Sequence, residues 1–323
     1  MSGLNVVKIE NFDVNKLSLG TPNKNIYGSP IAPVLYDGKP RLLISINKKL
    51  HAPFSIQAKR VKGQKVDTTN TGKDFQNGAE MNLSFPAENY TEDIVYQKFQ
   101  EIDQKFIQLI HDYGKWPEEQ QEIAVELSKL TGKDDKGRLG KWKRLVKWPA
   151  KKDENDKLIY NNKYPPYLQV KVLSEVTTQT VNGVSEDKAD FTAKGAQFYR
   201  ENNEEIPEVT SDNLDEVLPP HSEVKPVLSL STVSAGDFGF TVKPVLKQMK
   251  IYPRAGFQKP TTFLGDDDDE QTEADATTSG EKPDNSADVE DDEDDEDDEY
   301  QKVESDDEDE EAPKGKTVQV KSS

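Results

Sequence analysis

The sequence contains no cysteine and only three histidines and three methionines in 323 residues. Without cysteine there is no disulfide framework, no thiol nucleophile, no iron–sulfur cluster and no cysteine-based zinc site. Long hydrophobic runs are also missing. A membrane helix needs about 20 apolar residues in a row, and Leu42–Ile46 is typical of the longest runs here. Because the first residues lack the basic-then-apolar pattern of a secretory signal, we expect a soluble, intracellular protein with no membrane association.

Motifs for catalysis and cofactor binding are equally scarce. His51, His111 and His221 lie far apart in the sequence, and none has a neighbour at the spacing of metal ligands. The GxxxxGK[ST], GxGxxG and GxSxG motifs are all absent. Carboxylates are numerous, but no pattern marks two of them as a catalytic pair. We therefore expect a non-catalytic protein without cofactor or metal, in which His111 is a surface residue of a helix.

Charge is distributed very unevenly along the chain, whose formal net charge is −19. The stretch 266–311 holds 27 acidic residues and only two basic ones, Lys282 and Lys302. Residues 1–265 hold 37 basic and 34 acidic residues, which gives this part a net charge of +3. Since the acidic stretch has almost no aromatic or branched apolar residues, we expect it to be disordered. The prediction is a mildly basic body, 1–265, followed by a disordered acidic tail, 266–323.

The hydrophobic pattern of the body predicts strands, then helices, then strands. Apolar runs at 31–36 and 41–47 flank Asp37-Gly38, which is the strongest short signal of a β-hairpin. Alternating apolar residues predict further strands at 53–60, 80–85, 166–176, 226–234 and 237–252. Pro244 interrupts the last of these, which favours an edge position or a bulge there. We expect residues 184–218 to be mostly loop, with a short helix at 194–201.

Between these strands the apolar period changes to three and four residues, from Val95 to Tyr113. This spacing predicts an amphipathic helix of about six turns. Gly114 is a suitable C-cap, and Pro117 suits the start of a second, shorter helix. A helical pair inserted at about 87–131 in a strand-rich body predicts an α+β fold built on a mostly antiparallel sheet or small barrel. The five-stranded oligonucleotide-binding (OB) barrel is one candidate, and spacing alone does not separate it from a sandwich.

Basic and aromatic residues alternate in the segment 137–152, which contains no acidic residue and two of the three tryptophans. Single-stranded nucleic acids are bound by cations along the phosphates and by flat side chains that stack on bases, each worth ~1–3 kcal/mol. Similar but weaker stretches occur near other strands. The predicted nucleic-acid-binding residues are Lys59, Arg60, Arg138, Lys141, Trp142, Lys143, Arg144, Lys147, Trp148, Lys151, Lys152, Tyr164, Tyr167, Lys247, Lys250 and Tyr252. The alternative is that the tryptophans belong to the core and the lysines to a solvated rim.

The body has only six arginines, and its positive charge comes mainly from lysine. Arginine is the usual reader of guanine edges, whereas lysine contacts phosphates as a point charge. We therefore expect sequence-tolerant binding of single-stranded DNA, with RNA as an alternative ligand. The acidic tail should compete with nucleic acid for the same cations and recruit replication or repair proteins. Ser305, which precedes a run of acids, is a candidate for phosphorylation.

Two segments carry a resemblance to a known family: PPYLQVKV at 165–172 and GFTVKPVLKQMKIY at 239–252. Their order after a strand cluster and an inserted helix resembles the single-stranded DNA-binding proteins of nucleocytoplasmic large DNA viruses. The resemblance covers roughly residues 25–256 and is one of layout. It implies an OB barrel that acts in viral DNA replication, recombination or repair, in the virion, at a viral replication site or in the nucleus. Phage-type members of the wider group end in acids and an aromatic residue, whereas this chain ends in APKGKTVQVKSS.

Two other functions fit the same composition. A chaperone of histones or other basic proteins would work through the acidic tail, and a virion structural protein would use its sheet faces for assembly. A homo-oligomer is compatible with every one of these functions. The DNA-binding and chaperone functions differ in whether the body or the tail binds the partner. A body without its tail should bind single strands more tightly if it is a DNA-binding protein, and should lose its partner if it is a chaperone.

Overall fold

The computed structural model describes residues 5–25, 28–59, 72–129, 142–152, 158–160, 163–181, 184–236 and 239–253. The predicted tail and its Ser305 lie outside these ranges, as do Arg60, Arg138 and Lys141. Within them, no helix combines the length and the apolar character needed to cross a membrane.

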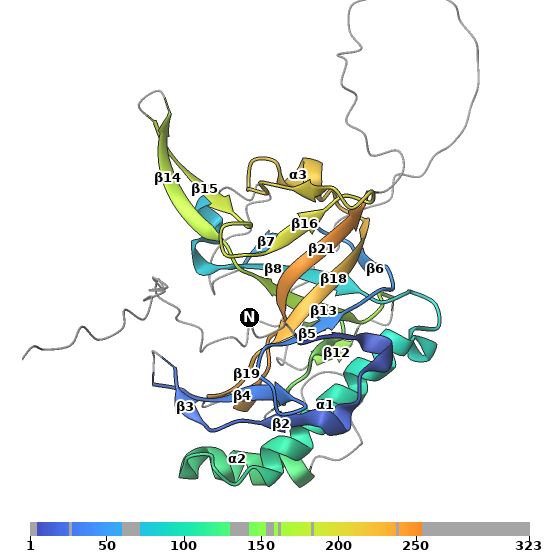
Figure 1. Ribbon diagram of the computed structural model, residues 1–323, viewed down its shortest axis with the longest axis vertical. Coiled ribbons are helices and arrows are strands. Elements are labelled where there is room, and N and C mark those ends of the chain that lie inside the picture. Colours follow the sequence, from blue (N-terminus) through green and yellow to red (C-terminus); the bar gives the residue numbers. More distant parts are fainter. Residues whose placement is uncertain are drawn as a thin grey trace, which may run out of the picture.

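Five strands close into a barrel (Figure 1). In chain order they are β6 (Leu50–Ala52), β8 (Ala79–Ser84), β13 (Tyr167–Val172), β18 (Ser222–Leu230) and β21 (Val245–Tyr252). Hydrogen bonding joins them as first-second-third-fifth-fourth and back to the first, and the third and fifth strands are parallel. This is the strand order of the OB barrel. The expected α+β class and small barrel are therefore confirmed, with both antiparallel and parallel pairs present.

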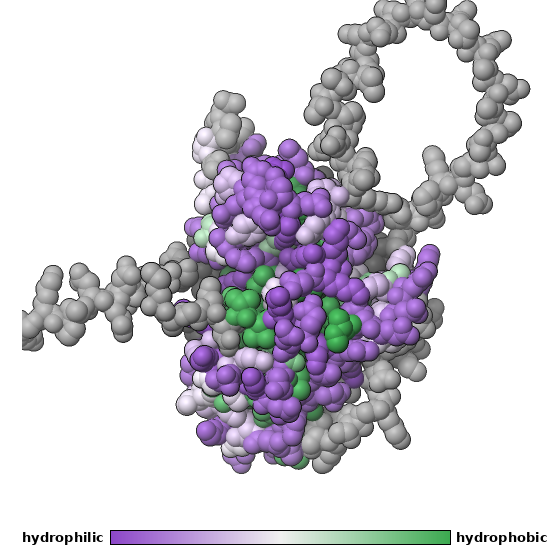
Figure 2. Space-filling model, turned by 45° about the vertical axis from the view of Figure 1, so that its right-hand side comes forward, coloured by the Kyte–Doolittle hydropathy of each residue, from purple (hydrophilic) through white to green (hydrophobic). Residues whose placement is uncertain are grey.

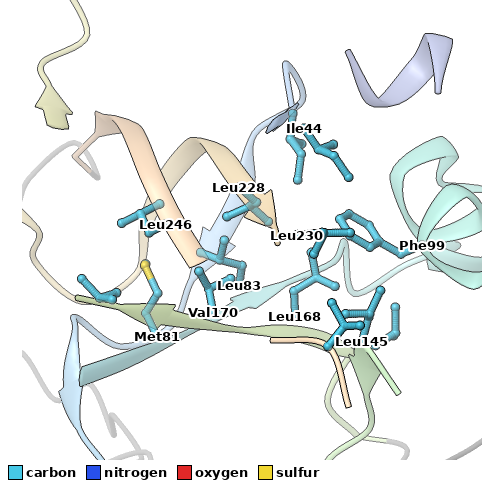
Figure 3. Packing of buried hydrophobic residues seen from close by; sticks show 14 of the residues in the cluster. Ile44, Met81, Leu83, Phe99, Leu145, Leu168, Val170, Leu228, Leu230 and Leu246 are labelled. Carbon is cyan, nitrogen blue, oxygen red and sulfur yellow. The ribbon is translucent and has the colours of Figure 1, made fainter. Parts of the chain in front are cut away.

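Alternation along the strands places one face of each inside the barrel (Figure 3). Met81 and Leu83 of β8 point inward, opposite Val170 and Leu168 of β13, and all four are buried. Leu228 and Leu246 add the inner faces of β18 and β21. Full burial of one such side chain stabilises the fold by roughly 1.5–3 kcal/mol. The alternation of apolar residues therefore determines which face of each strand is exposed to solvent.

The predicted helical pair is present and lies between β8 and β13 as α1 (Ile94–Asp112) and α2 (Glu118–Lys129). Asp93 caps α1, because its carboxylate accepts hydrogen bonds from the backbone N–H groups of Val95 (2.8 Å) and Tyr96 (3.2 Å). The buried stripe of α1 brings Phe99 against the barrel core beside Leu168 and Leu230 (Figure 3).

A second sheet packs beside the barrel, and the chain passes directly from a barrel strand into it. Its strands are β2 (Leu17–Leu19), β3 (Asn23–Lys24), β4 (Pro30–Tyr36), β9 (Trp142–Lys143), β19 (Thr232–Gly236) and β20 (Gly239–Thr241). β18 runs into β19 with one residue between them, Ser231, whose carbonyl accepts a hydrogen bond from Val34 N (2.8 Å). Pro244 falls between β20 and β21, so it ends one strand and precedes another in a different sheet.

Shorter elements complete the described part of the chain. They are the strands β1 (Asn5–Lys8), β5 (Leu42–Ser45), β7 (Gln57–Ala58), β10 (Val146–Lys147), β11 (Ala150–Lys152) and β12 (Leu158–Tyr160), and the 3-10 helices η1 (Ile9–Asn11), η2 (Val14–Lys16), η3 (Gly72–Asn77) and η4 (Tyr90–Glu92). β5 and β6 both pair antiparallel with β18, so they are two halves of one long first strand.

The predicted hairpin of residues 31–36 and 41–47 is wrong, although its turn is present. Asp37 and Gly38 have φ angles of 54° and 72°, and Tyr36 and Lys39 exchange two backbone hydrogen bonds. The flanking strands then separate: β4 pairs with β2, β3 and β19, whereas β5 pairs with β1 and β18. Pro40 lacks a ladder donor, and Arg41 has a left-handed φ of 63°, which turns the chain away from β4.

The expected helix at 194–201 is wrong, and the stretch 184–218, expected to be mostly loop, also contains regular elements. The region contains β15 (Val184–Asp190), β16 (Gln197–Tyr199), β17 (Glu205–Ile206) and a short helix, α3 (Leu214–Val217). β15 pairs along its whole length with β14 (Glu175–Val181), and the two form an arm that projects from the body (Figure 1). Because the arm is solvated and mostly polar, its sequence shows no alternation of apolar residues.

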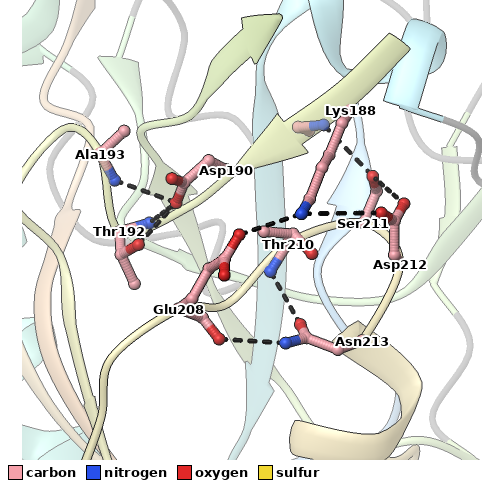
Figure 4. A network of polar contacts seen from close by, with 10 residues as sticks. Lys188, Asp190, Thr192, Ala193, Glu208, Thr210, Ser211, Asp212 and Asn213 are labelled. Atoms are coloured by element: carbon pink, nitrogen blue, oxygen red, sulfur yellow. Dashed lines mark hydrogen bonds and ion pairs between the residues drawn. The ribbon is translucent and has the colours of Figure 1, made fainter. Parts of the chain in front are cut away.

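Polar contacts hold the base of this arm (Figure 4). Lys188 of β15 pairs with Glu208 (3.0 Å), and Asn213 bonds to Thr210 N (2.8 Å) and to the carbonyl of Glu208 (3.0 Å). Asp190 accepts hydrogen bonds from the next turn of the chain. The base of the arm is therefore held by these side-chain contacts together with backbone hydrogen bonds, such as that from Ser211 N to the carbonyl of Ala189 (2.8 Å), and by the buried Ala189 and Phe191.

Truncation of Phe99 tests the packing of α1 on the barrel. Phe99→Ala should lower the free energy of unfolding by ~3–5 kcal/mol, because it leaves a cavity among buried apolar side chains. Ile94→Ala, at an exposed position of the same helix, is the matched control and should cost far less. Urea denaturation followed by circular dichroism measures both, and equal losses would contradict this description of the core.

Candidate nucleic-acid interface

A row of cross-strand partners runs round the outside of the barrel, through all five barrel strands and β10, and three of its six members, Tyr252, Ser84 and Tyr167, are buried. Each member is the direct cross-strand partner of the next, and the residues beside them in each strand point into the core. Opposite residues of antiparallel pairs project to the same side of a sheet, and strands lie about 4.8 Å apart, so the curved path of the row round the barrel is about 24 Å long. In order, the row consists of Tyr252, Glu223, His51, Ser84, Tyr167 and Lys147.

Three lysines surround Tyr252 at one end of the row. The ammonium nitrogen of Lys49 lies 4.2 Å from the centre of the tyrosine ring, and those of Lys225 and Lys250 lie 5.4 Å away. Lys49 also pairs with Glu223 (2.7 Å), and this hydrogen bond raises the pKa of Lys49 above its ordinary value. Only 9% of Tyr252 is exposed. Tyr252 therefore holds ammonium groups over its ring and leaves little ring surface for a base.

Polar side chains follow the same face across β8 and β13. Asn82 lies opposite Gln169, and Glu80 lies opposite Lys171, which is exposed. Lys147 of β10 donates a hydrogen bond to Gln169. Amide, ammonium and carboxylate groups thus alternate over the second and third strands of the barrel, which are the strands that bind oligonucleotides in OB folds.

In the part of the chain that the structure describes, two aromatic rings are exposed enough for a base to stack on them. Phe54, two residues beyond β6, is 44% exposed, and Tyr164, three residues before β13, is 38% exposed. The ammonium group of Lys163 lies 5.7 Å from the centre of the Tyr164 ring. Figure 2 shows a mostly hydrophilic surface with a group of hydrophobic side chains in the middle of one face. Such an arrangement combines charge with apolar contact area.

The two tryptophans predicted to stack on bases are part of the core. Trp142 is fully buried on β9, where its indole N–H donates to Asp103 (3.0 Å) and its ring lies 5.9 Å from that of Phe106. Trp148 is 8% exposed and packs edge-on against Tyr96. Neither ring offers a face to a base. The alternative interpretation, in which both tryptophans belong to the core, therefore holds. They are buried because their segment packs on α1.

Asp103 is the buried group that fixes this segment to α1. Its carboxylate accepts hydrogen bonds from Trp142 and from the backbone N–H of Leu145 (3.0 and 3.2 Å to the two oxygens). Burial raises the pKa of Asp103 to about 7, against the opposing effects of the Leu145 hydrogen bond, the Arg144 charge and the Trp142 hydrogen bond. Arg144 is itself buried and donates to Gln100 (3.1 Å), so it serves the packing of α1.

The other predicted residues fall into three groups. Lys147, Tyr167, Lys250 and Tyr252 lie on the row or in its lysine cluster. Half-buried positions elsewhere are Lys143 on β9, Lys247 on β21 and Lys59 just after β7. Lys151 and Lys152 belong to β11, and their side chains lie outside the described residues. Five residues of this surface were not among the predicted binding residues: Lys49, His51, Phe54, Lys171 and Lys225. Alternation in β6, β13 and β18 places three of these, His51, Lys171 and Lys225, on the outer face.

No group of three or more histidine, aspartate or glutamate side chains in the described ranges is arranged to hold a metal ion. The expectation that the chain is not an enzyme stays a prediction. What the described surface offers is charge, hydrogen-bonding groups and exposed rings on the outside of a barrel with OB strand order.

Comparisons with known proteins return phage proteins. The chain matches no protein-family model and no curated protein sequence. Among solved structures, gp2.5, a single-stranded DNA-binding protein encoded by bacteriophage T7, superposes with a TM-score of 0.31 and 10% identity, over 68% of this chain and 98% of that chain. The single-stranded DNA-binding protein of bacteriophage Enc34 gives 0.34 and 9%, over 76% and 96%. Its C-terminal truncation gives 0.32 and 11%, over 74% and 96%.

These TM-scores are low, so the function proposed below rests on the strand order and the surface of this chain itself. All three solved structures are of phage single-stranded DNA-binding proteins. The resemblance to proteins of nucleocytoplasmic large DNA viruses stays a prediction from layout.

The raised pKa of Asp103 predicts how stability depends on pH. Between the ordinary value of 3.8 and about 7, the folded chain keeps a proton that the unfolded chain has released. The free energy of unfolding should therefore fall as pH rises through this window. Asp103→Asn has no such proton, so the stability of the wild type relative to this variant should decline from pH about 4 to about 7.

Urea denaturation at a series of pH values measures this difference. Asp112→Asn, at an exposed position of the same helix, is the control and should leave the pH profile of the wild type unchanged. Parallel profiles for the wild type and Asp103→Asn would show that Asp103 does not titrate in this window.

Proposed function

We propose that the protein is a sequence-tolerant, non-catalytic single-stranded DNA-binding protein. The observation that carries the proposal is the cross-strand row with its lysine cluster, on the outside of a barrel with OB strand order. OB barrels bind single strands on the face of the second and third strands. Here that face holds Asn82, Gln169 and Lys171, with Lys147 beside it.

Lysines supply most of the attraction in this proposal. Lys49, Lys225 and Lys250 at one end and Lys147 and Lys171 at the other place ammonium groups along the row. A lysine contacts a phosphate as a point charge and carries no base information. Phe54 and Tyr164 supply ring surface on which any base can stack. Both kinds of contact are tolerant of sequence.

The acidic tail has a regulatory role in the proposal. Its 27 acidic residues follow a body with a net charge of +3, so the tail competes with nucleic acid for the lysines of the row. Salt weakens both interactions. When DNA displaces the tail, its carboxylates become available to basic surfaces of replication, recombination or repair proteins. Phosphorylation of Ser305 would strengthen the competition.

Removal of two lysines tests the row as the path of the DNA backbone. Lys171→Ala with Lys225→Ala should weaken binding of a labelled oligonucleotide for every sequence and reduce the salt slope of log affinity by about 1.4, at about 0.7 per lost phosphate contact. Lys115→Ala, an exposed lysine between α1 and α2, is the control. Fluorescence anisotropy at several salt concentrations gives the slopes. If the double variant behaves like the control, the row is not the path.

Removal of the tail tests the competition. A chain ending at Gly265 should bind single-stranded DNA more tightly than the full chain at low salt, and the difference should shrink as salt is added. Duplex DNA serves as competitor in the same anisotropy titration and should displace the strand poorly. Failure of both chains to bind would reject the proposal, and histone pulldown with the tail would then test the chaperone alternative.

A further inference from the structure

Two histidines that are 170 residues apart in the sequence meet on the outside of the barrel. His51 lies on β6, and His221 directly precedes β18. Nε2 of His51 and Nδ1 of His221 are 3.4 Å apart. The two rings are nearly parallel, with an interplanar angle of 20° and centres 5.4 Å apart. The fold therefore creates a pair of imidazole nitrogens that the sequence spacing does not reveal.

The backbone holds both rings in place. His51 sits between the buried residues Leu50 and Ala52, so alternation along β6 directs its side chain outward. His221 has a left-handed φ of 65°, and the next residue, Ser222, bonds through Oγ to the carbonyl of Pro219 (2.6 Å) and pairs with Ala52. A left-handed conformation is uncommon for residues other than glycine, although histidine adopts it more readily than most.

We propose that His51 and His221 chelate a divalent cation of the zinc class. Neutral imidazole is a preferred ligand of Zn²⁺, with metal–nitrogen distances of about 2.0–2.1 Å. Two nitrogens at these distances in a tetrahedral arrangement are separated by about 3.4 Å, whereas adjacent nitrogens of a square-planar site are separated by about 2.9 Å. The observed separation of 3.4 Å, at which one ring also donates a hydrogen bond to the other when no metal is bound, is close to that of the tetrahedral arrangement.

The groups around the two histidines determine how tightly a cation would be bound. Glu223 is the cross-strand partner of His51, and its carboxylate is bound to Lys49 at 2.7 Å. The protein thus offers two nitrogen ligands, and water completes the shell of the cation. Such a site binds more weakly than a site with three or four protein ligands. Chelation does not depend on the proposed DNA-binding function, although His51 is a member of the row.

Cobalt(II) tests the proposal, because it replaces Zn²⁺ and absorbs visible light strongly only when its coordination is tetrahedral. The metal-free full chain, without nucleic acid, is titrated with Co²⁺ and then with Zn²⁺. We expect a saturable tetrahedral absorption band at one Co²⁺ per chain, which Zn²⁺ removes. His51→Ala and His221→Gly should each abolish the band. His111→Ala should keep it, since His111 lies on α1 and contacts Asp112.

The acidic tail is present in every variant, so Co²⁺ held by its carboxylates cannot account for a difference among them. Circular dichroism shows whether each variant is folded. In the wild type, imidazole ¹⁵N NMR should show Zn²⁺-dependent shifts at His51 and His221 and none at His111, which tests the pair without any substitution. The absence from the wild type of both the tetrahedral band and the Zn²⁺-dependent shifts of His51 and His221, or survival of the band in both ligand variants, would overturn the proposal and leave the DNA-binding proposal unaffected.

Discussion

Closure of the barrel through β18 is the constraint on which the rest of the structure depends. This strand pairs with β21 on one side and with β5 and β6 on the other, and its inward residues are buried. Because closure leaves no free edge among the five strands, one face of each strand becomes core and the other becomes exterior. The positions of the lysines around Tyr252 and of the two histidines follow from this register. A slip of one residue in β18 would move Lys225 inward and Val224 outward.

A buried carboxylate gives the segment after α2 a structural role in place of the expected binding role. Asp103 collects hydrogen bonds from Trp142 and Leu145 at a buried position on α1, with the buried Arg144 nearby. Loss of that acceptor would leave buried donors without a partner, which costs about 1–3 kcal/mol for each group. The tryptophans are therefore core residues held in a fixed register on α1, and among the described charged residues around them Arg144 is buried while Lys143 and Lys147 are half-buried.

Local patterns predicted the elements better than their partners. The three-and-four spacing of apolar residues located both helices, and alternation located most strands of the barrel. The turn at Asp37-Gly38 was also located, yet β4 and β5 join different sheets, because packing decides strand partners. The β14–β15 arm was missed, since its solvated strands need no apolar alternation. For the candidate interface, composition identified Lys147, Tyr167, Lys250 and Tyr252, but only the register shows that they lie on the outer side of the barrel. The approach of His51 to His221 has no local signal at all.

The passage of β18 into β19 has a consequence for how the body can be divided. A single stretch of chain, 222–236, supplies a central strand to the barrel and then one to the neighbouring sheet (Figure 1). A cut anywhere along it would deprive one sheet of a strand that its neighbours require. The barrel and the second sheet should therefore melt together in one cooperative transition. Fragments made to isolate the barrel must retain both sheets, and a protease that opens this stretch would inactivate the whole body in a single event.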